Sequence, residues 1–382
     1  MKKIVSLIII SLLLLSQTFT ATIYAEEQNS LKGEAKSVIL MEAVTGKVLY
    51  EYQADTRLPP ASVTKIMTIL LVMEELDKGT FKLSDNVQVS ERASKMGGSQ
   101  VYLKAGEIMS VEDLLKSVIV ASANDASTAL AELVSGSVEA FVTRMNERAR
   151  ELGMLGTSFE NPTGLDDSVK DHLTSSRDIA IMSRELLKHK DIFKYTTIWM
   201  DTIRNGAFGL SNTNHLIRFY KGANGLKTGS TSKAGFCISA TAERNGMQLI
   251  AVVMGSPTRD SRNETAKTLL DHGFANYRFY HTDPKEVQPV KVLGGVENHC
   301  SLICEGFDSV LTKDIYAKGI TVEVTLPKNV KAPIKAGEKI GEAVFKAGEE
   351  IIGTASIKAA ESVGKLSFSG ILRRLIASFF YS

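Results

Sequence analysis

Strand-like segments lie at both ends of the first two thirds of this chain, and helical segments lie between them. Two apolar runs within residues 35–53 flank the turn-like "EAVTGK" and predict a hairpin. Residues 233–255 hold two further runs joined at Asn245-Gly246, a dipeptide that strongly favours a two-residue hairpin turn. This order predicts an α+β fold in which the first and last strands pair in one antiparallel sheet covered by helices.

The helical middle contains three segments with apolar residues at helical spacing. The first begins at Ser62 and stops at Gly79. The second begins at Ser110 with a capping-box pattern, and the third covers residues 138–154. Between the last two, the chain breaks at "ASAN", residues 121–124, which we expect to form a loop between helices.

The character of the chain changes after about residue 284. Short strand-like runs separated by Gly, Pro and charged turns predict a small all-β domain over residues 284–362. Residues 363–382 then show an amphipathic helical pattern, which suits a membrane surface with its arginines near anionic head groups. The alternative is a helix packed on its own domain. In either case the apolar face of the predicted helix would carry Leu366, Phe368, Ile371, Leu372, Leu375, Ile376, Phe379 and Phe380. Arg373 and Arg374 would lie off that face.

The N-terminus resembles an export signal. A basic start, "MKK", precedes the apolar run Ile4–Leu15, and Ala25 is a plausible cleavage edge, so residues 1–25 are predicted to be a signal peptide. The alternative is a retained membrane anchor, but the run is shorter than the roughly 20 residues that span a bilayer. We expect the mature protein to work outside the cytoplasmic membrane.

Charge and residue counts exclude several other classes. A net charge of +2 with both signs scattered gives no footprint for nucleic acid. The six histidines form no "H-E-x-x-H" pattern, and we expect neither a metal nor another cofactor. No "G-x-S-x-G" elbow is present, which disfavours a Ser-His-Asp hydrolase. Three cysteines make no disulfide framework, although a turn between Cys300 and Cys304 would allow a bond between them.

The pattern "S-x-x-K" occurs three times, at Ser62, Ser230 and Ser362. Only Ser62 enters a predicted helix, where a lysine three residues later shares its face. Lys65 could then take the Ser62 proton, provided that burial or a nearby cation lowers its pKa. The alternative is that Ser62 simply caps the helix and Lys65 is solvated. Ser230 begins a strand, where side chains three apart point to opposite faces, and Ser362 lies in a polar linker.

Two further motifs favour Ser62 as a nucleophile. One is "SAN", Ser122 to Asn124, in the break between helices, where a hydroxyl and an amide can face a cleft. The other is "KTG", Lys227 to Gly229, which leads into a predicted edge strand. Gly229 would leave room for the close approach of a ligand. A second S-x-N pattern, Ser84 to Asn86, lies in a predicted surface turn, so we prefer Ser122.

In this order, "SVTK", "SAN" and "KTG" resemble the motifs of the penicillin-recognising serine enzymes. The flanking "LPPASVTKIMT", "MGGSQVYLKAGE", "NPTGLDD" and "GLKTGSTSKAGFCISA" resemble the low-molecular-mass penicillin-binding proteins that are D-alanyl-D-alanine carboxypeptidases. The resemblance covers nearly the whole chain and implies a DD-peptidase/β-lactamase-like catalytic domain over residues 26–283. One departure is Ala123, where the family usually has glycine.

The resemblance implies a role for each motif residue. Ser62 would attack the bond between two terminal D-alanines of a peptidoglycan stem peptide, on the outer face of the cytoplasmic membrane, facing the cell wall or periplasm. Lys65 would be the base, and Ser122 would pass a proton to the leaving amine. β-Lactams would trap Ser62. The implied binding residues are Asn124 for the substrate amide, Lys227 beside Ser122, Thr228 and Arg262 for the terminal carboxylate, and Gly229 and Ser230, with the Ser62 and Ser230 N–H groups as the oxyanion hole.

Three alternatives share parts of this pattern. A serine β-lactamase has the same three motifs, but the class A "E-x-x-L-N" signature is absent and the β domain argues against it. A transpeptidase differs only in whether an amine or water intercepts the acyl-enzyme. A non-catalytic wall-binding protein or β-lactam sensor could keep the fold. The complete set of proposed catalytic side chains favours the enzyme.

Overall fold

The computed structural model describes residues 30–166 and 169–380 of the chain. The expected signal peptide, residues 1–25, lies outside the described residues. The chain forms two compact units that divide between Phe274 and Ala275, and each is described separately. The first strand of the second unit, β10 (Tyr277–Thr282), pairs with β13 (Phe307–Thr312), so the second unit begins before the boundary expected between residues 283 and 284.

A five-stranded antiparallel sheet of order β2-β1-β9-β8-β7 forms the centre of the first unit. Strand β1 pairs with β9, so the first and last strands lie side by side, as the sequence predicted. Asn245 and Gly246 have φ angles of +52° and +74°, as the predicted hairpin turn requires. The strands are β1 (Ser37–Glu42), β2 (Val48–Tyr52), β7 (Ala223–Thr231), β8 (Gly235–Arg244) and β9 (Met247–Ser256).

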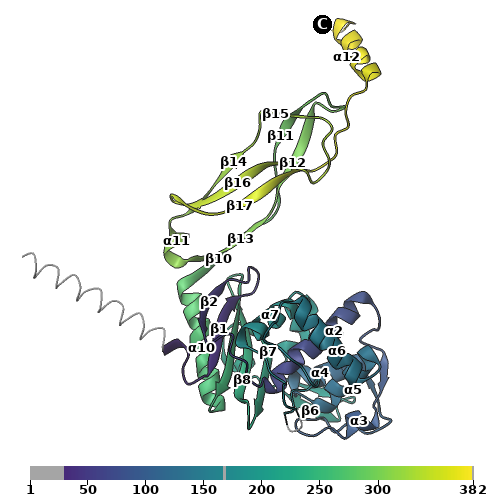
Figure 1. Ribbon diagram of the computed structural model, residues 1–382, viewed down its shortest axis with the longest axis vertical. Helices are drawn as coiled ribbons and strands as arrows, with labels where there is room; N and C mark the ends of the chain where they lie inside the picture. The colour runs from purple at the N-terminus through teal and green to yellow at the C-terminus, as the bar shows by residue number, and fades with distance from the viewer. Residues whose placement is uncertain (1–29, 167–168, 381–382) are drawn as a thin grey trace, which may run out of the picture. The chain divides into compact units, whose positions relative to one another are not determined.

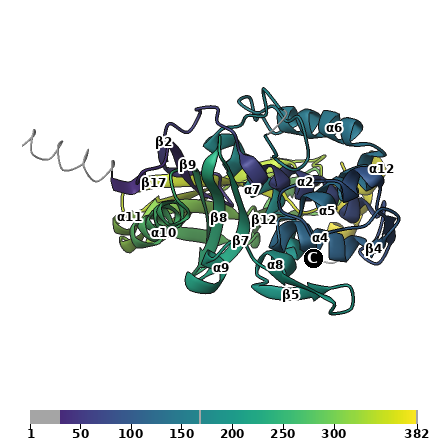
Figure 2. The same ribbon diagram turned by 90° about the horizontal axis from the view of Figure 1, so that it is seen from below.

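Helices cover both faces of this sheet, as Figure 1 and Figure 2 show. Helix α10 lies on one side, where Gly273 allows it to approach Leu40 and Leu249 closely. Helix α7 packs against β1 and β9 on the other side, together with the rest of the helical group. The longer helices are α2 (Lys65–Lys78), α4 (Val111–Val120), α5 (Asn124–Ser135), α6 (Val138–Glu151), α7 (Ser176–Leu186) and α10 (Arg259–Asn276).

Helix α2 is the centre of the helical group, because every residue from Lys65 to Met73 is buried. It ends at Gly79 in the left-handed conformation, as predicted, and the Ser110 hydroxyl accepts from the N–H of Asp113 at the start of α4. The short elements are η1 (Ala61–Thr64), β3 (Asn86–Gln88), α3 (Glu91–Ser94), β4 (Ile108–Ser110), η2 (Lys190–Ile192), α8 (Phe193–Thr196), β5 (Met200–Ile203), β6 (Phe208–Ser211) and α9 (Leu216–Phe219).

The second unit is the predicted all-β domain. Its larger sheet has the order β14-β16-β17-β12-β11-β15. Cys300 and Cys304 lie on the buried face of the same strand and are free thiols, so no turn brings them together. The strands not yet given are β11 (Lys285–Leu293), β12 (His299–Cys304), β14 (Ile320–Thr325), β15 (Asn329–Lys331), β16 (Lys339–Ala347) and β17 (Glu350–Ala359), with one short helix, α11 (Lys313–Ala317).

The last element is the helix α12 (Phe368–Phe380). Phe368, Ile371, Leu372 and Ile376 are exposed on it, while Arg374 donates to Asn298 Oδ1 of the β domain. Over the described residues, no helix is both long enough and apolar enough to cross a membrane.

Candidate active site

Ser62 lies on a single 3₁₀ turn, η1, that leads into α2. The sequence predicted a regular helix start, but the α-helix begins only at Lys65. Side chains three apart eclipse one another on a 3₁₀ turn, and Lys65 Nζ lies 2.9 Å from Ser62 Oγ. The cap residues are Pro60 for η1 and Thr64 for α2, and the Ser62 hydroxyl instead contacts Lys65, so the structure supports the co-facial pair rather than the helix cap.

Lys65 is completely buried, although a charged amine normally requires water or a carboxylate partner. Its Nζ donates to Asn124 Oδ1 at 2.6 Å and to the Thr163 carbonyl at 2.7 Å, and both acceptors are neutral. Burial, and then the charge of Lys227, hold the pKa of Lys65 well below its usual range, with Asp125 opposing the shift. A neutral amine that donates these two bonds keeps its lone pair for the Ser62 proton.

Ser122 occupies the predicted break between α4 and α5 with a φ of +62°. Such a conformation is costly for a residue with a Cβ and is typical of functional sites. Lys227 Nζ donates to Ser122 Oγ at 2.9 Å and to the Thr228 carbonyl at 3.0 Å. Burial, together with the charge of Arg262, lowers the pKa of Lys227 to about 7. The site therefore holds two serine–lysine pairs, and the lysine of each pair is buried.

Strand β7, the edge strand of the sheet, forms the facing wall of the site. A Cβ at Gly229 would lie 2.7 Å from Ser62 N and 2.9 Å from the Pro60 carbonyl. The space that the sequence analysis assigned to a ligand is thus already occupied by the backbone of the nucleophile turn. One residue earlier, Thr228 Oγ1 donates to Thr213 Oγ1 at 2.8 Å.

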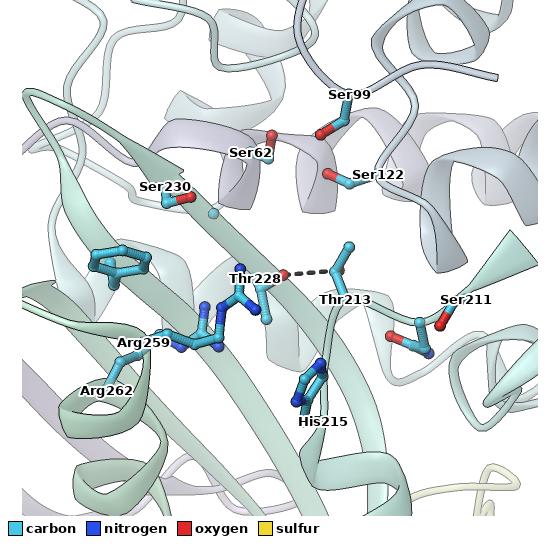
Figure 3. Close-up of a pocket in the computed structure, with 13 residues that line it drawn as sticks. Ser62, Ser99, Ser122, Ser211, Thr213, His215, Thr228, Ser230, Arg259 and Arg262 are labelled. Atoms are coloured by element: carbon cyan, nitrogen blue, oxygen red, sulfur yellow. Dashed lines mark hydrogen bonds between the residues drawn. The ribbon is translucent and has the colours of Figure 1, made fainter. Parts of the chain in front are cut away.

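These residues surround a pocket of about 330 Å³, drawn in Figure 3. Of the residues predicted from the sequence, six line it: Ser62, Ser122, Thr228, Gly229, Ser230 and Arg262. The other three, Lys65, Asn124 and Lys227, are buried and contact the pocket-lining serines or one another. The remaining lining residues are Ser99, Ser211, Asn212, Thr213, His215, Phe236 and Arg259, none of which the sequence analysis singled out.

Two further groups that support the site were missed. The Asp125 carboxylate accepts from the N–H groups of Val101 and Leu103, which anchors the loop opposite β7. His172 Nδ1 accepts from the Glu160 N–H, so its Nε2–H donates to Thr64 Oγ1 at 2.8 Å. Burial lowers the pKa of His172 to about 4, which keeps this link to the nucleophile turn neutral.

The competing serine motifs lie elsewhere. Ser84 belongs to the turn before β3, as predicted, and does not line the pocket. Lys233 Nζ reaches the Asp166 carbonyl rather than Ser230. Ser362 Oγ accepts from the Ala336 N–H in the second unit.

Comparison with known proteins shows the family to which the chain belongs. Residues 23–258 match the D-alanyl-D-alanine carboxypeptidase family, and residues 274–365 match the C-terminal domain of penicillin-binding protein 5. The chain belongs to the D-alanyl-D-alanine carboxypeptidase family. The family resemblance and the α+β fold inferred from the sequence are thereby confirmed.

Relatives of this family match either nearly the entire chain or about two thirds of it. The D-alanyl-D-alanine carboxypeptidase DacF of Bacillus subtilis is 42% identical over 98% of both chains. Penicillin-binding protein 5 of Haemophilus influenzae has a solved structure that is 33% identical, covers 87% of this chain and 98% of its own, and superposes with a TM-score of 0.76. Penicillin-binding protein D2 of Listeria monocytogenes, solved in an ampicillin-bound form, is 31% identical over 63% of this chain and 98% of its own, with a TM-score of 0.58.

Proposed function

We propose that this protein is a serine-type carboxypeptidase that removes the terminal D-alanine from peptidoglycan stem peptides through an acyl-enzyme on Ser62. The observation that carries the proposal is the contact between Ser62 Oγ and the buried amine of Lys65 at the edge of the pocket. Because burial lowers the pKa of Lys65, the neutral amine that can accept a proton is favoured over the ammonium form.

In the first step, Lys65 takes the Ser62 proton as Oγ attacks the carbonyl carbon of the penultimate residue. The N–H groups of Ser62 and Ser230 stabilise the oxyanion. Ser122, with Lys227 bonded to its hydroxyl, passes to the leaving amine of D-alanine the proton that Lys65 took from Ser62, so the Lys65 amine is neutral again. Water, deprotonated by the same base, then releases the shortened peptide and restores Ser62.

The pocket offers matching groups for the rest of the substrate. Asn124, whose amide donates to the Gly97 carbonyl and accepts from Lys65, lies where it can hold the substrate backbone. Thr228 and Arg262 lie on the side of the pocket that would take the terminal carboxylate. A β-lactam places a carbonyl and a carboxylate in similar positions, so we expect β-lactams to acylate Ser62.

The test uses the chain without residues 1–25. We expect D-alanine release from a peptide ending in D-Ala-D-Ala, and a stable benzylpenicillin adduct on Ser62 by intact mass and peptide mapping. Ser62→Ala should abolish both. Rapid drug hydrolysis without an adduct would favour a β-lactamase. A folded protein that gives neither adduct nor hydrolysis would favour a non-catalytic sensor.

We also propose that the protein is exported and that residues 363–382 lie in a membrane surface, joined through the β domain to the catalytic domain. The exposed apolar side chains of α12 support this proposal, with Arg373 suited to anionic head groups. Cosedimentation with anionic vesicles should be lost when residues 363–382 are deleted. Equal binding of both forms would leave α12 as a helix packed on its own domain.

A further inference from the structure

Two arginines from one helix turn approach the same end of the pocket. Arg259 and Arg262 are three residues apart in the first turn of α10, so they share a face, and both line the pocket near Thr228. Figure 3 shows both side chains extending from α10 toward Thr228. His215 lines the same end from the opposite side.

The two arginines are only partly balanced by a negative charge, because the Asp260 carboxylate in the same turn acts on Arg262 without pairing with it among the described residues. Arg262 is buried, and its guanidinium donates to Asn263 Oδ1 through Nε and Nη2 and weakly to the Cys237 carbonyl through Nη1. These acceptors are neutral, and within residues 30–166 and 169–380 no ion pair involves Arg262 or Arg259. Burial, and then the charge of Arg259, lower the pKa of Arg262 to about 10.

Both arginines carry their positive charges in the first turn of α10. Cations are unfavourable in the first turn of a helix because the backbone dipole is positive there. A buried arginine without a paired carboxylate, next to a second arginine and inside a pocket, is costly unless an anion binds. Arg262 has only part of its five N–H donors left, since Asn263 Oδ1 takes one from Nε and one from Nη2 and the Cys237 carbonyl takes one from Nη1. A carboxylate at this end needs another donor to be fully satisfied.

We propose that Arg259 is a second binding residue for the substrate's C-terminal carboxylate, acting from the solvent side while Arg262 acts from the protein side. The inference rests on the proposed function and deepens it. Two guanidinium groups around one carboxylate favour substrates in which the scissile bond is one residue from a free C-terminus. The exposed side chain of Arg259 thus contributes to the selectivity for release of a single terminal residue.

The experiment compares wild-type protein, Arg259→Gln and Arg259→Lys on two ligand pairs. The first pair is an N-acylated peptide ending in D-Ala-D-Ala and its C-terminal amide. The second pair is benzylpenicillin and its methyl ester, for which the rate of Ser62 acylation is measured. Lys267→Gln is the matched control, because it removes one positive charge from the same helix away from the pocket.

We expect Arg259→Gln to lower kcat/KM on the free acid by about tenfold or more, mainly through KM, as the loss of a charge-assisted hydrogen bond predicts. On the amide and the methyl ester the same substitution should change the rate by less than about twofold. Arg259→Lys should restore part of the loss on the acid. Lys267→Gln should match wild type on all four ligands.

Equal losses on acid and amide would overturn the inference, because a structural effect does not depend on the ligand's charge. An Arg259→Gln variant that matches Lys267→Gln on the free acid would also overturn it and leave Arg262 as the arginine responsible. In both cases the wild type still releases D-alanine, so the proposed function stands. A wild type that releases none, with no adduct on Ser62, would overturn the proposed function and the inference with it.

Discussion

Replacing Lys227 by methionine should abolish activity and make folding less sensitive to acid. Lys227 is buried with a pKa of about 7, whereas a lysine in an unfolded chain titrates near 10.4. Between these two values the unfolded chain binds a proton that the folded protein does not. The free energy of unfolding of the wild type therefore rises with pH above about 7, and this contribution is lost as pH falls through 7.

The size of this change in the free energy of unfolding follows from the lowered pKa of Lys227. Between pH 7 and 8.5 the linkage slope is about 1.4 kcal/mol per pH unit, which amounts to about 2 kcal/mol, and below pH 7 it levels off. Lys227→Met removes this dependence. Its stability relative to wild type should be about 2 kcal/mol more favourable at pH 5.5 than at pH 8.5. The hydrogen bonds lost from Ser122 Oγ and the Thr228 carbonyl do not depend on pH and cancel in this difference.

Thermal unfolding of both proteins at the two pH values measures the effect. A difference of about 2 kcal/mol corresponds to a relative change in Tm of about 4–8 °C for a domain of this size. Lys227→Met also removes the charge that lowers the pKa of Lys65. This second change favours the variant over the wild type at the lower pH as well. Lys267→Met, at a partly exposed lysine paired with Glu264, should show no such difference. The same Tm difference between variant and wild type at pH 5.5 and 8.5 would refute the reasoning.

Two other substitutions test the geometry of the site. Gly229→Ala should reduce the rate of acylation by a β-lactam about a hundredfold or more. The new Cβ would lie 2.7 Å from Ser62 N and 2.9 Å from Val63 N, where the oxyanion donors must be held. Acylation at the wild-type rate in a stopped-flow experiment would contradict this contact. Asp125→Asn should lower the free energy of unfolding by about 1–3 kcal/mol, because one amide N–H₂ must then face backbone N–H groups that the carboxylate now accepts. Denaturant unfolding measures this loss, and an unchanged midpoint would show that the loop does not depend on Asp125.

Several features of the fold could be predicted from local sequence because their causes are local. The Asn245-Gly246 turn, the end of α2 at Gly79 and the cap at Ser110 each depend on the conformational preference of one or two residues. Helix α10 was not predicted because its pattern is not amphipathic. Its buried face includes Arg262, Asn263 and Thr265, so apolar periodicity gives no signal there.

The sequence by itself determined the order of the elements, the family resemblance and the residue types that the chemistry needs. Only the tertiary structure decided which of them meet. Sequence spacing suggested that Ser62 and Lys65 share a face, but the 3₁₀ turn, the position of Ser122 and the contact with Lys227 depend on distant segments. The lowered pKa values of Lys65 and Lys227 arise first from burial, and then from the charge of Lys227 on Lys65 and of Arg262 on Lys227. Burial is a property of the packed chain, so no local pattern could show which lysine becomes a base.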